Sequence, residues 1–179
     1  MNATRSYFLR AVVPFLYFLM APVIVMATEV GGGYSRQLVE NTGLEQYELF
    51  VREPLPYKTI VGDTLPVFSA LEIAAGLIRD ANDDHFGIGK FSVMPQVVLE
   101  PNDRIHYFFG LGAGLMAGDT KFSRHDLGGP FFLASKLGMR FFLGEGWGLE
   151  ASYYHQSNAG IYDHNASLNM LQMAFVYDF

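Results

Sequence analysis

The sequence predicts an all-β protein, an eight-stranded antiparallel transmembrane β-barrel, and three observations support this prediction. Several segments alternate large apolar residues with polar or small ones at a period of two, the pattern of strands that have one apolar face. Half of the residues are hydrophobic and 15% are aromatic, whereas only 17% are charged. Clusters of Pro, Gly, Asn and Asp separate the alternating segments and provide the turns between strands.

The predicted strands follow one another along the chain. The first two are weak and cover residues 30–37 and 44–53, and the residues Pro54-Leu55-Pro56 end the second. Stronger alternation follows in residues 67–77, 90–100, 104–115, 131–143, 147–158 and 169–179, with breakers at 82–84, 101–103, 128–130 and 144–146. These segments have the length of about 10 residues that tilted membrane strands require, and the smallest outer-membrane barrels have eight of them.

The two faces of the predicted strands differ in a way that favours a membrane barrel. Leu, Phe, Met and Tyr fill the apolar faces, while many small residues fill the opposite faces, as suits a narrow lumen packed with side chains. The charged residues on those opposite faces are then predicted to be internal and paired: Glu72, Lys90, Lys136, Arg140 and Glu150.

A soluble ligand-holding barrel of the lipocalin type is the competing architecture, with its apolar face turned inward. The C-terminus argues against it. Phe175, Tyr177 and Phe179 alternate up to the last residue, which looks like the C-terminal pattern of outer-membrane barrels.

The N-terminus is typical of an export signal. Arg5 and Arg10 precede an uncharged stretch, residues 11–27, and Val25-Met26-Ala27 is suited to cleavage after Ala27. A permanent N-terminal anchor is the alternative, although Pro14 and Pro22 favour removal. We therefore expect a signal peptide at residues 1–27 and a single barrel domain at residues 28–179, located in the outer membrane.

Charge and cysteine content exclude several functions. Cleavage would remove two of the 12 Lys and Arg residues and none of the 18 Asp and Glu residues, for a net charge of −8. Such an acidic chain is a poor partner for nucleic acid. The absence of Cys excludes disulfides and thiolate metal sites, and His85, His106, His125 and His164 show no metal-ligand spacing, so no metal site is predicted.

Three polar residues are predicted to share the lipid-facing side at one rim of the barrel. His155 and Ser157 lie at the end of the penultimate strand, on the face that carries Tyr153, and Asn169 begins the last strand with lipid-facing parity. Because both termini of such barrels are periplasmic, the loop between these strands is extracellular. An imidazole can activate a serine hydroxyl, and a third group orients the imidazole. The arrangement predicts a lipid esterase site.

The same residues resemble a known family. His155-Gln156-Ser157-Asn158-Ala159-Gly160, followed by Asn165 and Asn169, is similar to the motif and loop of the lipid A 3-O-deacylases, which are outer-membrane barrels. The runs 128–132 and 138–141 and the terminal Tyr177-Asp178-Phe179 fit the same family. The resemblance covers mainly the C-terminal third of the chain.

The resemblance implies hydrolysis of the ester at the 3-position of lipid A in the outer leaflet, without a cofactor. Transferred residue by residue, it makes Ser157 the nucleophile and His155 the general base, with Asn165 and the backbone N–H of Gly160 as oxyanion donors. Asn158 is a motif neighbour. The partners it implies are lipid A or lipopolysaccharide and the membrane, and a homodimer is left open.

The chain departs from the family pattern at Asn169, where a glutamate that orients the histidine is expected. An asparagine can hold an imidazole tautomer, as in Cys-His-Asn proteases, but it supplies no charge. Asp163 is the alternative orienting group, and an inactive relative is a further alternative. Two non-enzymatic functions also stay open: a small outer-membrane barrel with a structural or adhesion role, and a periplasmic lipid-binding barrel.

Overall fold

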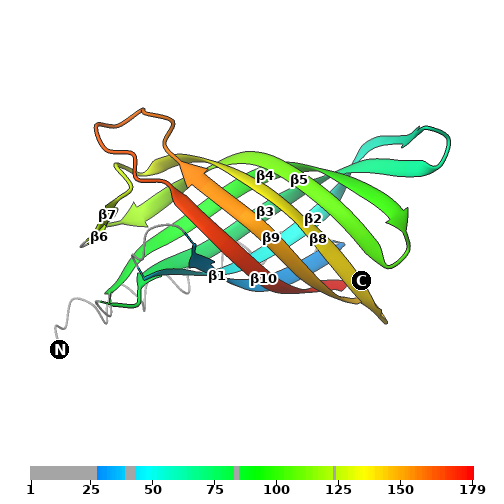
Figure 1. Ribbon diagram of the computed structural model, residues 1–179, viewed down its shortest axis with the longest axis horizontal. Coiled ribbons are helices and arrows are strands. Elements are labelled where there is room, and N and C mark those ends of the chain that lie inside the picture. Colours follow the sequence, from blue (N-terminus) through cyan, green and yellow to red (C-terminus); the bar gives the residue numbers. More distant parts are fainter. Residues whose placement is uncertain (1–27, 39–42, 83–84, 123) are drawn as a thin grey trace.

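The computed structural model describes residues 28–38, 43–82, 85–122 and 124–179, and their strands form a closed antiparallel barrel (Figure 1). The predicted signal peptide lies outside the described residues. The strands are β1 (Glu29–Gln37), β2 (Leu44–Val61), β3 (Leu65–Asp80), β4 (His85–Asn102), β5 (Ile105–Gly118), β6 (Lys121–Phe122), β7 (His125–Asp126), β8 (Phe131–Gly144), β9 (Trp147–Ser157) and β10 (Leu168–Asp178). Among these residues, no helix is long and apolar enough to cross a membrane.

Eight of the strands make the barrel wall, in the order β1, β10, β9, β8, β5, β4, β3, β2, which confirms the predicted fold class. Every neighbouring pair is antiparallel, and β1 closes the barrel by pairing with β10, from Glu29 opposite Asp178 to Gln37 opposite Met170. Closure removes the free edge along the paired length of β1 and β2, up to Arg52, so the backbone polar groups there can bond within the protein, as a membrane requires.

Two features of the strands differ from the sequence prediction. β2 continues past Pro54 and Pro56 to Val61, because its pairing with β3 shifts register between Pro54 and Lys58. Proline lacks an N–H and is tolerated in strands at such irregularities. The second difference is the short hairpin of β6 and β7, which lies between β5 and β8 in the chain and forms a separate sheet.

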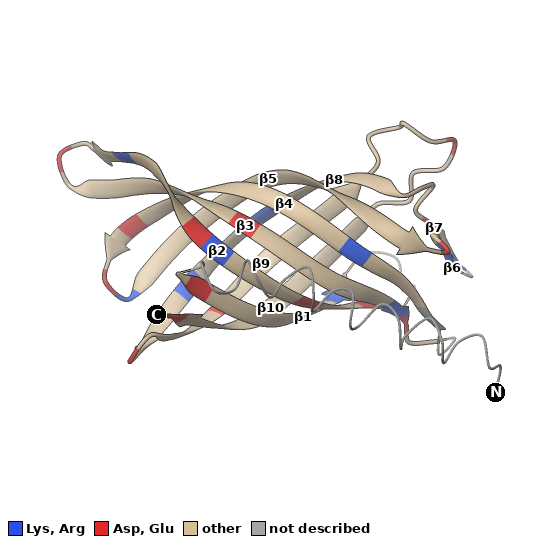
Figure 2. Cartoon of the chain, turned by 180° about the vertical axis from the view of Figure 1, so that it is seen from behind, with Lys and Arg blue, Asp and Glu red and all other residues tan. Residues whose placement is uncertain are grey.

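The apolar faces of the strands point outward and the charged faces point inward, which decides against a soluble ligand-holding barrel. Leu137 and Phe175 are 58% and 64% exposed, whereas Lys136 and Glu150 are each only 1% exposed. A wall of this polarity suits lipid outside and a polar lumen inside. Figure 2 shows charged positions on neighbouring strands of the barrel wall and at its ends, with long uncharged stretches between them.

The lumen is filled by an ion-pair network of four cations and four carboxylates, which confirms the predicted internal pairing and extends it. Arg52 Nη2 lies 2.6 Å from Glu72 Oε2 and 2.8 Å from Glu150 Oε2. Lys136 Nζ lies 2.7 Å from Glu72 Oε1. The network comprises Glu29, Glu48, Arg52, Glu72, Lys90, Lys136, Arg140 and Glu150. Its formal charges balance, so the buried ions compensate one another.

Glycines make room for large aromatic side chains within the same lumen. A Cβ at Gly114 would lie 2.3 Å from the ring of Phe132, and a Cβ at Gly138 would lie 2.5 Å from the ring of Phe108. Both rings are almost fully buried. The glycine faces seen in the sequence are therefore needed for close packing across a narrow barrel.

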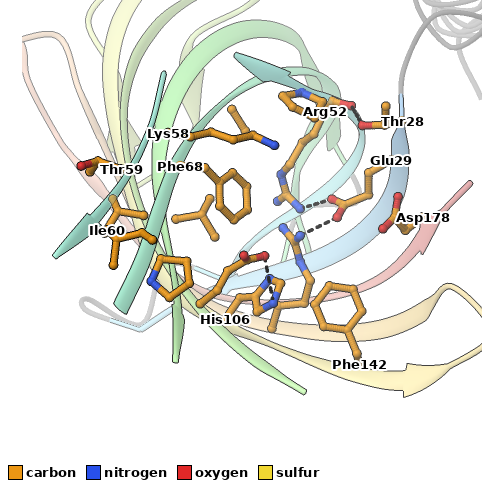
Figure 3. A pocket seen from close by; sticks show the side chains of 17 residues that line it. Thr28, Glu29, Arg52, Lys58, Thr59, Ile60, Phe68, His106, Phe142 and Asp178 are labelled. Atoms are coloured by element: carbon orange, nitrogen blue, oxygen red, sulfur yellow. Dashed lines mark hydrogen bonds and ion pairs between the residues drawn. The ribbon is translucent and has the colours of Figure 1, made fainter. Parts of the chain in front are cut away.

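The two ends of the barrel have different connections. At the end where Glu29 and Asp178 lie, short turns at 62–64, 103–104 and 145–146 join the strands. A cavity of about 490 Å³ lies at this end, next to Thr28 and Asp178, and Arg52, Glu29 and Arg140 of the ion-pair network line it (Figure 3). Longer connections, residues 119–130 and 158–167, lie at the opposite end. Short turns at one end and long loops at the other are typical of outer-membrane barrels.

Candidate functional site

The predicted site residues lie on the β9–β10 hairpin, at the end of the barrel opposite Glu29 and Asp178 and therefore away from the cavity. β9 ends at Ser157, the β9–β10 loop (residues 158–167) follows, and Asn169 is the second residue of β10. His155 pairs directly with Asn169 across the two strands. Directly opposed residues present their side chains on the same face, and this face is the lipid-facing one. The structure thus places His155, Ser157 and Asn169 where the parity of the strands predicted them.

A hydrogen bond joins His155 to Asn169. His155 Nδ1 lies 2.9 Å from Asn169 Oδ1. Because an amide oxygen can only accept, the Nδ1 atom carries the proton in this arrangement. The Nε2 atom then keeps its lone pair, which is the state that an imidazole needs in order to take a proton from a hydroxyl. Both side chains are half-buried, so the pair is accessible from the outer surface of the barrel.

Tyr153 and Ser167 complete the environment of Asn169. The Tyr153 hydroxyl donates to Asn169 Oδ1 at 2.6 Å, so this oxygen accepts from both the imidazole and the phenol. Asn169 Nδ2 donates to Ser167 Oγ at 3.3 Å. The amide therefore has its oxygen toward two donors and its nitrogen toward an acceptor.

Ser157 lies two residues beyond His155 on the same face of β9, and it pairs across the sheet with Leu133 of β8. The side chain is half-buried. Among the described residues, its hydroxyl makes no hydrogen bond, including none to His155. The structure thus brings His155 and Asn169 into contact and places Ser157 beside them on the lipid-facing side without a direct bond.

Asn158, the motif neighbour, is buried and anchors the loop from the other side of the strand. Its Nδ2 atom donates to Leu127 O at 3.0 Å and to His164 O at 2.6 Å. Its Oδ1 atom accepts from the backbone N–H of Gly160 at 2.9 Å. The N–H of Gly160, one of the two predicted oxyanion donors, is therefore engaged in this structure.

Asn165, the other predicted oxyanion donor, is held through its oxygen. Asn165 Oδ1 accepts from the backbone N–H of Asn158 at 2.9 Å. No hydrogen bond of the Asn165 Nδ2 atom is formed with any described residue, so its two N–H groups are available to an incoming oxygen. Asn165 is exposed on the loop.

The connection between β5 and β8 supports the β9–β10 loop. The backbone N–H of Ala166 donates to Asp126 O at 3.0 Å, and the Tyr162 hydroxyl accepts from the N–H of Phe131 at 3.1 Å. Gly128 has a φ of 84°, and a Cβ there would lie 1.9 Å from His164 O. This close approach explains the Gly128-Gly129 run noted in the sequence, because the loop packs directly on it.

Ser135 and Tyr153 are neighbours of the site that received no role from the sequence. Ser135 of β8 pairs with His155 of β9. Tyr153 lies two residues before His155 on β9, on the same face. Strand parity alone would have placed both side chains on the lipid-facing side. Ser135 is a polar residue among the large apolar residues of that face. Tyr153 also has this parity, but a lipid-facing tyrosine is expected at any membrane interface.

The alternative orienting group, Asp163, is exposed in the loop and makes no hydrogen bond to His155. Among the described residues, no group of three His, Asp or Glu side chains could hold a metal ion. The arrangement of histidine, amide and nearby serine is chemically suited to nucleophilic attack on an ester.

Comparison with known proteins identifies the family. The family model described as lipid A 3-O-deacylase (PagL) matches residues 57–178. The chain belongs to this family. Membership implies a hydrolase. The matched residues include the barrel strands β3, β4, β5 and β8 and the entire β9–β10 hairpin. A search of curated protein sequences found no match.

One solved structure shares the barrel of this PagL-family chain, and two others were also found. The crystal structure of the outer membrane enzyme PagL superposes with a TM-score of 0.70 at 17% identity, covering 84% of this chain and 99% of that one. The outer membrane protein Ail of Yersinia pestis gives 0.46 at 18% identity, covering 83% and 97%. Neisserial surface protein A gives 0.49 at 7% identity, covering 84% and 94%. The first of these supports the eight-stranded outer-membrane fold.

Proposed function

We propose that this protein is exported by its signal peptide, residues 1–27, and hydrolyses the ester-linked acyl chain at the 3-position of lipid A in the outer leaflet. The observation that supports this best is the His155–Asn169 hydrogen bond on the lipid-facing side, beside Ser157. A soluble substrate would have no reason to meet an imidazole and a hydroxyl there, whereas a lipid reaches them by lateral diffusion.

The proposed reaction begins with Ser157. Its Oγ attacks the ester carbonyl carbon while His155 Nε2 takes the hydroxyl proton, and Asn169 keeps the imidazole in the required tautomer. The tetrahedral intermediate collapses, the sugar oxygen leaves, and the imidazolium returns the proton to it. Water, activated by the same imidazole, then hydrolyses the acyl-serine to a free fatty acid and restores Ser157. No cofactor is needed.

Asn165 is the proposed main oxyanion donor. Its oxygen is held by Asn158, so its amide N–H groups are oriented without being used. A donor of this kind contributes about 2.7–4 kcal/mol to transition-state stabilisation in known hydrolases. Gly160 can contribute its N–H only after that group releases Asn158 Oδ1.

The surface next to the site suits an acyl chain. Leu133 lies opposite Ser157, and Leu137 and Leu171 lie opposite Tyr153 on its two sides, all on the lipid-facing face. An acyl chain in the outer leaflet would lie along these side chains with its ester near Ser157. This placement requires no cavity in the protein, in agreement with the packed lumen.

Replacement of Ser157 by alanine, or of His155 by asparagine, tests the proposal. Each variant should lose on the order of 10⁴-fold in deacylation rate, as triad dissections in other hydrolases show. Mass spectrometry of lipid A from cells that carry each variant measures the loss of the 3-linked acyl chain. Heat-modifiable migration on gels, together with outer-membrane fractionation, controls for folding.

Ser135→Ala is the matched control, because Ser135 is the other lipid-facing serine next to His155. It should retain deacylation. If Ser157→Ala still removes the 3-linked acyl chain fully, Ser157 is not the nucleophile. The same conclusion follows if only Ser135→Ala loses deacylation.

The amide at position 169 supports the second candidate function, a non-catalytic outer-membrane barrel. Without a carboxylate, the imidazolium formed in the reaction has no counter-charge from this residue. The same lipid A spectra discriminate the two functions. Identical lipid A with and without the wild-type protein would favour the structural role.

A further inference from the structure

The phenol of Tyr153 contacts the candidate site directly, unlike that of an ordinary interfacial aromatic residue. Tyrosines at membrane interfaces usually direct the hydroxyl toward water or head groups. Here the hydroxyl instead donates to Asn169 Oδ1 at 2.6 Å, a short and therefore well-formed bond. Asn169 is the residue that holds His155, so the phenol acts on the site through that amide.

The bond matters because an asparagine amide can rotate so that its oxygen and nitrogen exchange places, whereas the two oxygens of a carboxylate are equivalent. With Oδ1 toward His155, the ring must carry its proton on Nδ1, and Nε2 is free to accept. With the amide reversed, Nδ2 would face the ring, Nδ1 would lose its proton, and Nε2 would carry it. The imidazole could then no longer take a proton from Ser157. A carboxylate has two acceptor oxygens and presents one of them in either orientation.

Two contacts select the productive orientation. The phenol donates to the oxygen, and Ser167 Oγ accepts from the nitrogen at 3.3 Å. A serine hydroxyl donates and accepts with similar ease, so Ser167 discriminates weakly. A phenol oxygen is a weaker acceptor than donor, because its lone pair is delocalised into the ring. The short Tyr153 bond therefore carries most of the selection.

We infer that Tyr153 is a positioning residue that fixes the amide of Asn169, and through it the Nδ1–H tautomer of His155. This inference rests on the proposed function, since the tautomer matters for turnover only if His155 is the general base. The tautomer itself can be observed without any turnover.

The first test is ¹⁵N NMR of the purified barrel in detergent with labelled histidine, in mildly alkaline buffer where a free imidazole is neutral. The signals of His155 are identified by their loss in His155→Asn. The wild type should show a protonated Nδ1 and an unprotonated Nε2. Tyr153→Phe should shift the ratio toward the Nε2–H form by roughly two- to tenfold, the effect of losing one neutral hydrogen bond. An unchanged ratio would overturn the inference.

The second test combines Tyr153→Phe with Asn169→Asp, which has the same size but cannot reverse its polarity. In the wild-type background, Tyr153→Phe should lower kcat roughly two- to tenfold with KM unchanged. In the Asn169→Asp background it should have little effect on kcat or on the tautomer. An equal loss in both backgrounds would overturn the inference, because the phenol would then act on the lipid or on the fold.

Tyr107→Phe is the matched control. Tyr107 is a lipid-facing tyrosine of β5 with 42% exposure, close to the 43% of Tyr153, and it pairs with Leu99 and Met139 away from the site. It should change neither the kinetics nor the NMR signals. If Ser157→Ala keeps full activity, the proposed function fails, while the NMR result still decides whether Tyr153 sets the tautomer.

Discussion

The replacement of Asn169 by aspartate is the most informative single change in this protein. The aspartate keeps the size of the side chain and therefore the 2.9 Å separation from His155 Nδ1, but it adds a negative charge beside the imidazole. A neutral hydrogen bond contributes about 0.5–1.5 kcal/mol, and a bond to a charged group about 1.5–3 kcal/mol. The difference, about 1–1.5 kcal/mol, acts mainly in the transition state, where the imidazolium forms.

This difference converts to a rate increase of about 5- to 13-fold, since about 1.36 kcal/mol corresponds to a factor of ten. Asn169→Glu, which restores the residue expected from the family, should preserve activity or raise it. Asn169→Leu should lower the rate about tenfold, because the ring loses its acceptor and the required tautomer is no longer favoured. Asp163→Asn should have little effect.

The assay is the release of fatty acid from one purified lipid A substrate in detergent, with kcat and KM measured separately for the four variants. Heat-modifiable migration verifies that each barrel is folded. A large loss in Asp163→Asn together with an unaffected Asn169→Leu would move the orienting role into the loop. A slower Asn169→Asp enzyme would show that charge at this position does not assist the reaction.

Three further variants, one of them a control, test the residues that support the site. Glu72→Gln weakens the contacts of a buried carboxylate with Arg52 and Lys136, and it should cost about 3–5 kcal/mol of stability in urea unfolding, whereas Glu45→Gln on the partly exposed surface should cost less than about 1 kcal/mol. Equal costs would contradict the role of the network. Asn158→Ala removes three loop contacts and should lower kcat together with about 1–3 kcal/mol of stability, measured by the same unfolding and fatty-acid assays. An Asn158→Ala enzyme with unchanged kcat would separate the loop from the chemistry.

Much of the barrel could be predicted because its determinants are local. Period-two alternation fixes which residues face lipid, and the same parity placed Lys136 inside and His155 outside. The continuation of β2 past Pro54 was missed, because a register shift that accommodates proline depends on the neighbouring strand. The β6–β7 hairpin was missed, because strands as short as Lys121–Phe122 have no measurable period.

The site was predictable only as far as strand parity extends. Parity and topology placed His155 beside Asn169, and the structure adds the bond between them. The link from Asn158 to Leu127 joins residues 31 positions apart in two loops, and no local pattern signals such a contact. The role of Tyr153 was hidden for another reason, because its position fits both an interfacial tyrosine and a partner of the amide.

The position of the site outside the barrel explains how a tightly packed lumen can coexist with catalysis. The eight network charges and the aromatic–glycine packing fill the interior beyond the cavity next to Thr28 and Asp178, and the proposed site needs no route for substrate through the lumen. The proposed reactive groups instead lie on the outer face of β9 and β10, and the loop held by Asn158 carries Asn165. Stability and chemistry therefore depend on opposite faces of the same strands. Changes to inward residues should alter unfolding with little effect on the pH-independent rate of the folded enzyme, and changes to His155 or Ser157 should do the reverse.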